Sequence, residues 1–473
     1  MNGFVDLLTH RAHRSMGISH HELGSSGISV SAFGLGSWHT WERLPREQAA
    51  ALLDHARSRG IDYLDVVRMN DETGRAPIPT GYNEVAFGEA FRASGWPRDE
   101  VTIAEALWWE FWPRESPTQE LEASLARVGI DHVDLVQTEP PPPEIAMDEF
   151  VGMMGELVAS GRSRAWGLVN WSPPHMVELA RAVRDAGVPG PAMTQVKYSL
   201  VVRGWVEDQA TAEALDLCGA SLIAANVLGG GVLSGKYARG SERGRWSTGF
   251  DHPHATRALT VVPALLELAD RLGEPPSALA FAFALAHPRV ATIQTAAMRP
   301  EHIDQSLRAL DVLERLSDDG LAELRAIGAD VAARTDRLTC FGDRRAFEED
   351  ALGAAGEATS EAPVAVIFVA LEELPPVDGA GAVDENNPSM QVAALGAQRV
   401  AAATGTRLYR AGDRLLAVLA APQEGAEPDD VHARLRTELE GGPPVRTAAC
   451  IVVPGEHPSQ VLERAQEALR GPV

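Results

Sequence analysis

The segment His132-Val-Asp-Leu-Val-Gln-Thr-Glu139 is a predicted β-strand that ends in a glutamate. From residue 28 to about residue 330, short runs of β-branched or apolar residues alternate with longer segments of helical period. This pattern is typical of a parallel sheet covered by helices. The eight expected strands are Val30–Trp38, Tyr63–Val67, Val101–Leu107, His132–Gln137, Arg164–Asn170, Ala192–Tyr198, Ser221–Val227 and Val290–Thr295.

Eight such units predict an α/β protein with a (β/α)8 TIM barrel, because an open doubly wound sheet usually has fewer strands. Helices are expected at Arg46–Arg59, Gln119–Val128 and Met176–Asp185, and glycines such as Gly60 and Gly129 follow them where a left-handed cap is needed. The phosphate-binding G-x-G-x-x-G motif of the open-sheet alternative does not follow the first strand.

The bulk composition indicates a soluble protein with one large and one small domain. The chain has 473 residues with 45% hydrophobic content, and it contains no run of about 18 uncharged apolar residues that would span a membrane. The first twenty residues lack the pattern of a secretory signal, so a cytoplasmic location is expected. A formal net charge of -24 argues against binding to nucleic acid or anionic lipid.

Metal and disulfide chemistry are not expected either. The three cysteines Cys218, Cys340 and Cys450 are far apart and form no Cys-x-x-Cys or Cys/His cluster. They therefore favour neither a disulfide framework nor a zinc site.

The character of the sequence changes after Gly342, where residues 343–361 have little apolar content. The predicted organisation is an N-terminal extension (1–21), the barrel (22–335), a linker (336–361) and a small α+β domain (362–473). In the small domain, strands are expected at Val364–Leu371, Thr406–Tyr409, Arg414–Leu419 and Thr447–Val453, with helices at Met390–Ala403, Pro428–Leu439 and Ser459–Leu469.

Several motifs, in order along the chain, resemble the aldo-keto reductases, particularly the branch that contains the potassium-channel β subunits. The resemblance covers residue 22 to about residue 325. Its motifs are Glu22-Leu-Gly-Ser-Ser-Gly-Ile-Ser-Val-Ser31, Gly34-Leu-Gly-Ser-Trp38, Gly60-Ile-Asp-Tyr-Leu-Asp65, Asn83-Glu84, Gly161-Arg-Ser-Arg-Ala-Trp-Gly167, Gln195 with Tyr198, and Gly231-Val-Leu-Ser-Gly-Lys-Tyr237.

The resemblance implies a reaction in which hydride passes from a nicotinamide to a carbonyl while a tyrosine donates the proton, helped by a lysine, an aspartate and commonly a histidine. Asp65 matches the aspartate. Asn70 stands where the tyrosine is expected, Ala106 where the lysine is expected with Glu105 beside it, and Glu139 at the histidine position. An amide and an alanine cannot replace a phenol and an ammonium.

Two catalytic alternatives remain open. Tyr82, after an apparent insertion at 71–79, would restore a phenol if it reached the site. Alternatively Asp65, Glu139 and Glu105 would form an acidic pocket, in which neighbouring carboxylates raise one another's pKa and leave one protonated beside an ionised base, as in a lyase or dehydratase. The competing structural interpretation leaves Glu139 solvated at the barrel rim and turns Glu105 outward.

The resemblance also implies binding of NADP(H). Asn170 and Gln195 match residues that hold the nicotinamide carboxamide, although Val169 and Ala225 replace a serine and an aromatic ring. The remaining candidates are Leu228, Leu233, Ser234 and Lys236 in the pyrophosphate loop, Arg299 near the 2′-phosphate, and Gln305 at the adenine.

The small domain resembles, more weakly, the palm fold of GGDEF domains and cyclases, with Ala411-Gly-Asp-Arg-Leu415 at the signature turn. Ala370 and Arg414 replace acidic residues, which leaves Asp413 alone and predicts no two-metal catalysis. A nucleotide-sensing or dimerising palm-like module is expected. An unrelated ferredoxin-like domain would explain the same order of elements.

The leading hypothesis is a pseudoenzyme: an aldo-keto reductase homologue that binds NADP(H), does not reduce carbonyls, and regulates or binds a partner. Its partner would be a small molecule or a protein, and a homo-oligomer is possible. The alternatives are an enzyme that transfers protons through Asp65 and Glu139, and an NADPH-dependent oxidoreductase that uses Tyr82 as its acid.

Overall fold

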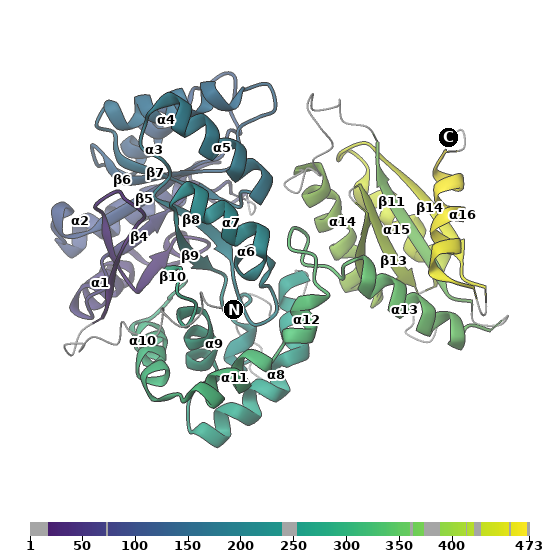
Figure 1. Cartoon of the computed structure of the whole chain (residues 1–473). Coiled ribbons are helices and arrows are strands. Elements are labelled where there is room, and N and C mark those ends of the chain that lie inside the picture. The colour runs from purple at the N-terminus through teal and green to yellow at the C-terminus, as the bar shows by residue number, and fades with distance from the viewer. Residues whose placement is uncertain are drawn as a thin grey trace. The chain divides into compact units, whose positions relative to one another are not determined.

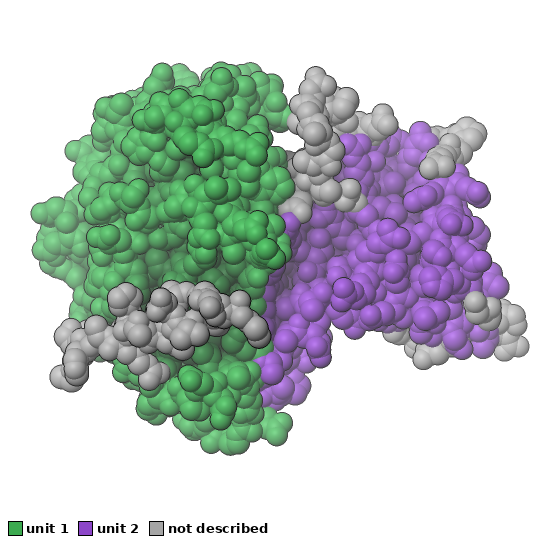
Figure 2. All heavy atoms as spheres, in the orientation of Figure 1, with its two compact units in different colours: residues 1–199, 205–228, 265–325 green, residues 200–204, 229–264, 326–473 purple. Residues whose placement is uncertain are grey.

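The computed structural model describes residues 18–71, 74–238, 253–359, 363–372, 388–412, 414–420, 427–453 and 456–470. The chain divides into two compact units (Figure 2). The barrel unit comprises residues 1–199, 205–228 and 265–325, and the C-terminal unit comprises residues 200–204, 229–264 and 326–473. Each unit is described separately below.

The barrel unit contains a closed barrel of eight parallel strands in the order β10-β3-β4-β5-β6-β7-β8-β9, which confirms the predicted (β/α)8 fold. The strands are β3 (Phe33–Gly36), β4 (Tyr63–Val66), β5 (Thr102–Leu107), β6 (Val133–Thr138), β7 (Ser163–Val169), β8 (Met193–Lys197), β9 (Ser221–Ala225) and β10 (Val290–Thr295).

Helices surround the barrel on its outside (Figure 1). They are α1 (Arg46–Ser58), α2 (Tyr82–Ser94), α3 (Pro117–Val128), α4 (Met147–Ala159), α5 (Pro173–Ala186), α7 (Gln209–Cys218), α9 (Pro276–Leu285) and α10 (Pro300–Arg315). The residues of α6 (Gly204–Glu207), α8 (Pro253–Leu272) and α11 (Asp318–Ala326) are divided between the two units. Ser116 illustrates their capping: its hydroxyl accepts from the Gln119 amide while the Gln119 side chain accepts from the Ser116 amide, so α3 begins at a capping box.

A hairpin of β1 (His20–Glu22) and β2 (Ser29–Ser31) closes the amino end of the barrel. Its apolar residues Leu23, Ile28 and Val30 belong to the same buried cluster as Tyr63 of β4 and Leu135 of β6. The turn comes so close to the barrel that a side chain at Gly24, whose φ is +53°, would lie 2.8 Å from the carbonyl oxygen of Ala192. The hairpin therefore covers the amino end of the barrel interior, and the region at the carboxyl ends of the strands is called the mouth from here on.

The C-terminal unit contains a four-stranded antiparallel sheet in the order β12-β13-β11-β14. The elements run β11 (Ala365–Leu371), α14 (Pro388–Thr404), β12 (Arg407–Gly412), β13 (Leu415–Ala420), α15 (Pro428–Leu439), β14 (Val445–Ile451) and α16 (Pro458–Arg470). This is the βαββαβ order of the ferredoxin-like fold, which the sequence left open. Asp413, on which the GGDEF resemblance depends, lies outside the described residues.

Both faces of this sheet are covered. Ile367 and Val369 of β11 pack with α14 and α15, whereas their neighbours Val366 and Phe368 pack on the opposite face. That opposite face is covered by α16 and by α13 (Arg344–Glu357), whose Phe347 ring contacts Phe368 with 6.0 Å between centroids. The unit therefore has three layers: two helices, a sheet and two helices.

The predicted linker is wrong for residues 344–357, because they form α13. Asp343 caps this helix by accepting a hydrogen bond from the amide of Ala346 at 2.8 Å. The segment looked polar because its buried face consists of small alanines around one phenylalanine, Phe347. A short helix, α12 (Ala329–Ala333), precedes it.

Among the described residues, no helix is long and apolar enough to cross a membrane. Within the same ranges, no group of three or more His, Cys, Asp or Glu side chains is arranged to hold a metal ion.

We expect Phe347→Ala to destabilise the C-terminal unit by about 3–5 kcal/mol, because it removes a buried ring from the core. Denaturant unfolding followed by circular dichroism measures the effect. Leu352→Ala on the same helix is the matched control, since Leu352 is 53% exposed, and should change the free energy of unfolding by less than about 0.5 kcal/mol. Equal stability of both variants would mean that α13 does not belong to the folded unit.

Candidate functional site

The side chains at the mouth follow from the two-residue alternation of the barrel strands. Tyr63 of β4, Leu135 of β6 and Met193 of β8 share one buried apolar cluster inside the barrel. Because alternate side chains point to the same face of a strand, Asp65, Gln137 and Gln195 also point inward, one layer nearer the mouth. By the same rule Glu139 and Lys197 follow in the next layer.

Asp65 is the centre of the inner polar layer. It is 2% exposed, and its carboxylate accepts hydrogen bonds from the side-chain amides of Gln137 and Gln294. Burial raises the pKa of Asp65 to about 7, and the two amides oppose that rise. Among the described residues, no tyrosine or lysine is hydrogen-bonded to this carboxyl group.

Two acceptors in this layer have no donor. The side-chain oxygens of Gln137 and Gln195 are buried and make no hydrogen bond in the described structure. An unsatisfied buried carbonyl costs roughly 1–3 kcal/mol, so each is a place where a ligand with an N–H or O–H group would bind favourably.

Glu139 lies above this layer at the end of β6. Burial raises the pKa of its carboxyl group, while a hydrogen bond from the Asn170 side chain and the nearby Lys197 charge act in the opposite direction. The Trp109 indole donates to the Glu139 carbonyl oxygen at 3.1 Å and to the Thr138 hydroxyl at 2.9 Å. Glu139 is therefore a largely enclosed carboxyl group with a fixed backbone, and not a solvated glutamate at the rim.

Lys197 is the residue that the sequence reading missed. It ends β8 and lies close enough to Glu139 to affect its pKa, yet no hydrogen bond and no ion pair within 4.0 Å involves Lys197 in the described part of the chain. A compositional signal could have identified it. Of the 42 lysine and arginine residues, all but Lys197 and Lys236 are arginine.

Glu105 is not part of the mouth. Its neighbour Ala104 belongs to the interior cluster, so alternation turns Glu105 toward the helices outside the barrel. There its carboxylate accepts from the backbone amides of Arg68 at 3.2 Å and Ala106 at 3.1 Å. Burial first, and then the charge of Glu84 on α2, raise its pKa well above the usual range. Glu105 therefore points outward, as the structural interpretation of the sequence expected, and does not join Asp65 and Glu139 in an acidic pocket.

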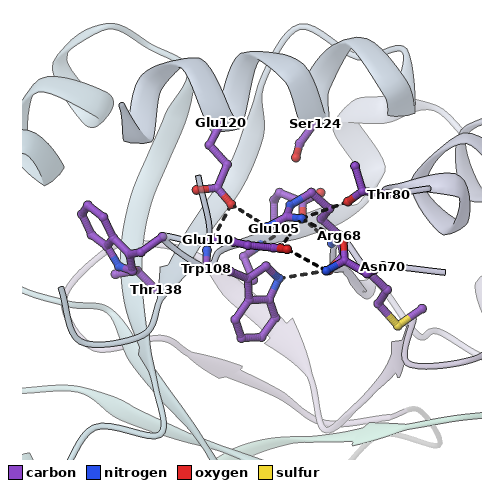
Figure 3. Close-up of polar contacts among 12 residues, drawn as sticks. Arg68, Asn70, Thr80, Glu105, Trp108, Glu110, Glu120, Ser124 and Thr138 are labelled. Atoms are coloured by element: carbon purple, nitrogen blue, oxygen red, sulfur yellow. Dashed lines mark hydrogen bonds and ion pairs between the residues drawn. The ribbon is translucent and has the colours of Figure 1, made fainter. Parts of the chain in front are cut away.

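Arg68 organises the loops beside the mouth (Figure 3). Its side chain is 1% exposed and donates to Glu110 at 2.8 Å, to the Thr80 hydroxyl at 2.9 Å and to Glu120 at 3.3 Å. Asn70, where a tyrosine was expected, donates to Glu110 at 2.8 Å and forms an isolated β-bridge with Thr80. The inserted segment is thus fastened to the loop after β5.

Tyr82 begins α2 and is partly buried. No hydrogen bond of its hydroxyl group is recorded among the described residues, and none links it to Asp65 or Glu139. The structure does not bring Tyr82 together with the buried carboxyls of the mouth.

Strained backbone is concentrated around the mouth. In the described ranges, four of the five non-glycine residues with positive φ follow barrel strands closely: His39 after β3, Trp109 after β5, Asn170 after β7 and Asn226 after β9. Their φ values lie between 51° and 60°. Such conformations cost on the order of 1–3 kcal/mol each and cluster at functional sites.

The nicotinamide-binding candidates fall in both units. Gln195 offers an unsatisfied acceptor that suits a carboxamide N–H, whereas Asn170 is occupied by Glu139. Arg299 precedes α10 and lies 3.0 Å from His302, Gln305 is exposed on the same helix, and Leu228 is half-buried after β9.

The other two candidates belong to a glycine-rich loop of the C-terminal unit, around the short 3-10 helix η4 (Val232–Ser234). Gly231 has a φ of +92°, and a side chain there would come within 3.0 Å of the Lys236 ammonium. Lys236 thus folds back over the loop, next to Ser234. Backbone amides in left-handed turns beside a lysine form a suitable phosphate cradle.

Comparison with known proteins gives a consistent result. Residues 32–329 match the model of the Aldo/keto reductase family. A probable voltage-gated potassium channel subunit beta of Oryza sativa subsp. japonica is 28% identical over 329 residues, which cover 66% of this chain and 98% of that protein. A putative subunit of the same name from Schizosaccharomyces pombe is 28% identical over 325 residues, covering 64% of this chain and 92% of that protein.

We expect Asp65 to make stability fall with rising pH between about pH 4 and pH 7. Its folded-state pKa of about 7 exceeds the unfolded value near 3.8, so the folded state binds more protons in this window. The free energy of unfolding should fall by at most about 1.4 kcal/mol per pH unit there, and Asp65→Asn should remove that slope.

Denaturant unfolding at several pH values measures this slope. The control is Asp99→Asn, which changes an exposed aspartate outside the barrel. A wild-type and an Asp65→Asn protein with the same pH dependence would show that Asp65 is ionised when folded.

Proposed function

Because the chain belongs to the aldo/keto reductase family, we propose that it binds NADP(H) and acts as a regulatory or partner-binding protein that does not reduce carbonyls through a tyrosine. The observation that carries the proposal is the environment of Asp65. Its carboxylate is hydrogen-bonded by Gln137 and Gln294, whereas the family's reaction would require a phenol and an ammonium beside it.

Features of each unit, taken separately, support nucleotide binding. In the barrel unit, Gln195 would accept from a carboxamide and Arg299 would pair with a 2′-phosphate. In the C-terminal unit, the loop containing Ser234 and Lys236 would hold phosphate oxygens. The cofactor would supply hydride in a reductase. Here the Asn170 side chain is hydrogen-bonded to Glu139, and Ala225 has no ring to cover the nicotinamide. Few contacts would therefore hold the nicotinamide ring in the orientation that hydride transfer needs.

A protein partner is supported by the relatives, which are named as subunits of voltage-gated potassium channels. The proposal extends to this chain only the general role of binding a partner. The ferredoxin-like domain of the C-terminal unit lies outside the region that matches the family, and in this proposal it is the part of the chain that adds regulation.

We expect the purified chain to quench or enhance NADPH fluorescence on titration without oxidising NADPH when aldehydes or quinones are added. Lys236→Met should weaken binding about tenfold or more, because it removes a charge-assisted contact to phosphate. Arg271→Met is the control, since Arg271 forms an exposed ion pair with Glu323. Aldehyde-dependent oxidation, or the absence of any binding, would overturn the proposal.

Glu139 favours a second candidate function, an enzyme that transfers protons without changing oxidation state. A burial-raised pKa lets a carboxyl group act as an acid or base nearer neutral pH, and Lys197 provides a positive charge beside it. Asp65 would be the second carboxyl group of this site, one layer deeper.

For this candidate, we expect the chain to exchange α-protons of small ketones and aldehydes with solvent deuterium, measured by proton NMR in heavy water. Glu139→Gln should lower the exchange rate at least about tenfold, in the range usual for loss of a general base. The control variant is Glu144→Gln, an exposed glutamate in the loop after β6. Equal rates for both variants would exclude Glu139 as the base.

A further inference from the structure

We propose that Lys197 is a nucleophile that condenses with the carbonyl group of a small hydroxyaldehyde or hydroxyketone in the barrel mouth, with Glu139 as its proton-transfer partner. This inference goes beyond nucleotide binding and does not require it. It names a substrate class and a covalent intermediate for the proton-transferring enzyme that is the second candidate function.

The direction of Lys197 follows from its neighbours on β8. Tyr198 faces the helices outside the barrel, where its ring lies 5.2 Å from Phe283 of α9 and its hydroxyl donates to Glu207 at 2.7 Å. Met193 faces the interior. Lys197 is four residues after the inward Met193 and one residue before the outward Tyr198, so alternation turns it into the mouth.

The amine is near Glu139 but not joined to it. Lys197 influences the carboxyl group electrostatically, yet their charged atoms are further apart than the 4.0 Å of an ion pair in the described structure. A carbonyl carbon that reacts with the amine needs a carboxyl group within reach of its oxygen, and the absence of an ion pair in the described residues leaves the amine available to react.

The identity of the residue argues for chemistry rather than charge. This chain uses arginine at every basic position except Lys197 and Lys236. Arginine would serve equally as a positive charge and forms better ion pairs, but its guanidinium is always protonated and does not form imines. Lysine at position 197 therefore supplies an amine that arginine could not, and imine formation with a carbonyl is a reaction for which enzymes use lysine.

The groups around the pair define the substrate. The free acceptor oxygens of Gln137 and Gln195 lie one layer below, so a substrate with hydroxyl donors next to its carbonyl would satisfy them. Asn170, held in a left-handed conformation, donates to Glu139 and fixes its orientation. These contacts favour small hydroxylated carbonyl compounds over apolar ones.

The step balances without an oxidant or reductant. After the Lys197 ammonium releases a proton to solvent, its amine forms a C–N bond to the carbonyl carbon, and the carbonyl oxygen takes the proton of Glu139. The resulting carboxylate removes a proton from the nitrogen and then returns it to the hydroxyl group, which leaves as water. The products are a protonated imine on Lys197, one water molecule and an ionised Glu139, which can next remove a proton from the adjacent carbon.

The test is reductive trapping of the full chain with glycolaldehyde or dihydroxyacetone and cyanoborohydride, in the absence of nucleotide. Intact mass should increase by the mass of one substrate molecule less one oxygen atom, and peptide mapping should place the adduct on Lys197. Because the chain has only two lysines, Lys236 is an internal control.

Lys197→Arg keeps the charge and should abolish trapping, whereas Arg271→Met, at an exposed ion pair with Glu323, should leave it unchanged. Glu139→Gln should slow trapping at least about tenfold. Circular dichroism of each variant checks that it folds. Equal labelling of Lys236, or labelling that persists in folded Lys197→Arg, would overturn the inference. NADPH titration reports on the nucleotide separately, so either proposal can fail alone.

Discussion

The two-residue alternation of a closed parallel barrel is the constraint on which the site depends. Because side chains at every second position share the interior, an apolar layer at Tyr63 and Leu135 is followed by a polar layer at Asp65 and Gln137. Space inside the barrel is limited, so Asp65 and Gln137 are buried by their neighbours, whereas Gln195, Lys197 and Glu139 nearer the mouth are half-buried. The chemistry of the mouth is thus set by which residue types occupy these few positions.

Much of the fold was predictable, and the exceptions have physical causes. All eight barrel strands lie within a few residues of their predicted positions, because each is a short apolar run between helical segments. Helix α13 was missed because alanine carries little hydrophobic signal, although Phe347 and a run of small residues suffice to cover a sheet. Glu105 could be placed only by strand register, which the sequence does not specify to one residue.

The candidate site was predictable only where a family pattern or a strand end marked it. Asp65 and Glu139 were identified in this way; Asp65 is buried, Glu139 is half-buried, and desolvation raises the pKa of both carboxyl groups. Lys197 carries no motif, and its importance depends on the carboxyl group that another strand brings near it. The Arg68 network is equally non-local, because a buried cation needs partners. Its partners Glu110, in the loop after β5, and Glu120, on α3, follow it by 42 and 52 residues in the chain.

The hairpin that closes the amino end of the barrel has a consequence for proton movement. Leu23, Ile28 and Val30 cover one end with apolar side chains, so among the described residues the polar approach to Asp65 is from the mouth, where Glu139 and Lys197 lie. A molecule bound at the mouth would therefore block proton exchange between Asp65 and solvent. Asp65 would keep the protonation state that it had when the molecule bound. Ligand binding would then store a proton inside the barrel, or keep one out, until the ligand leaves.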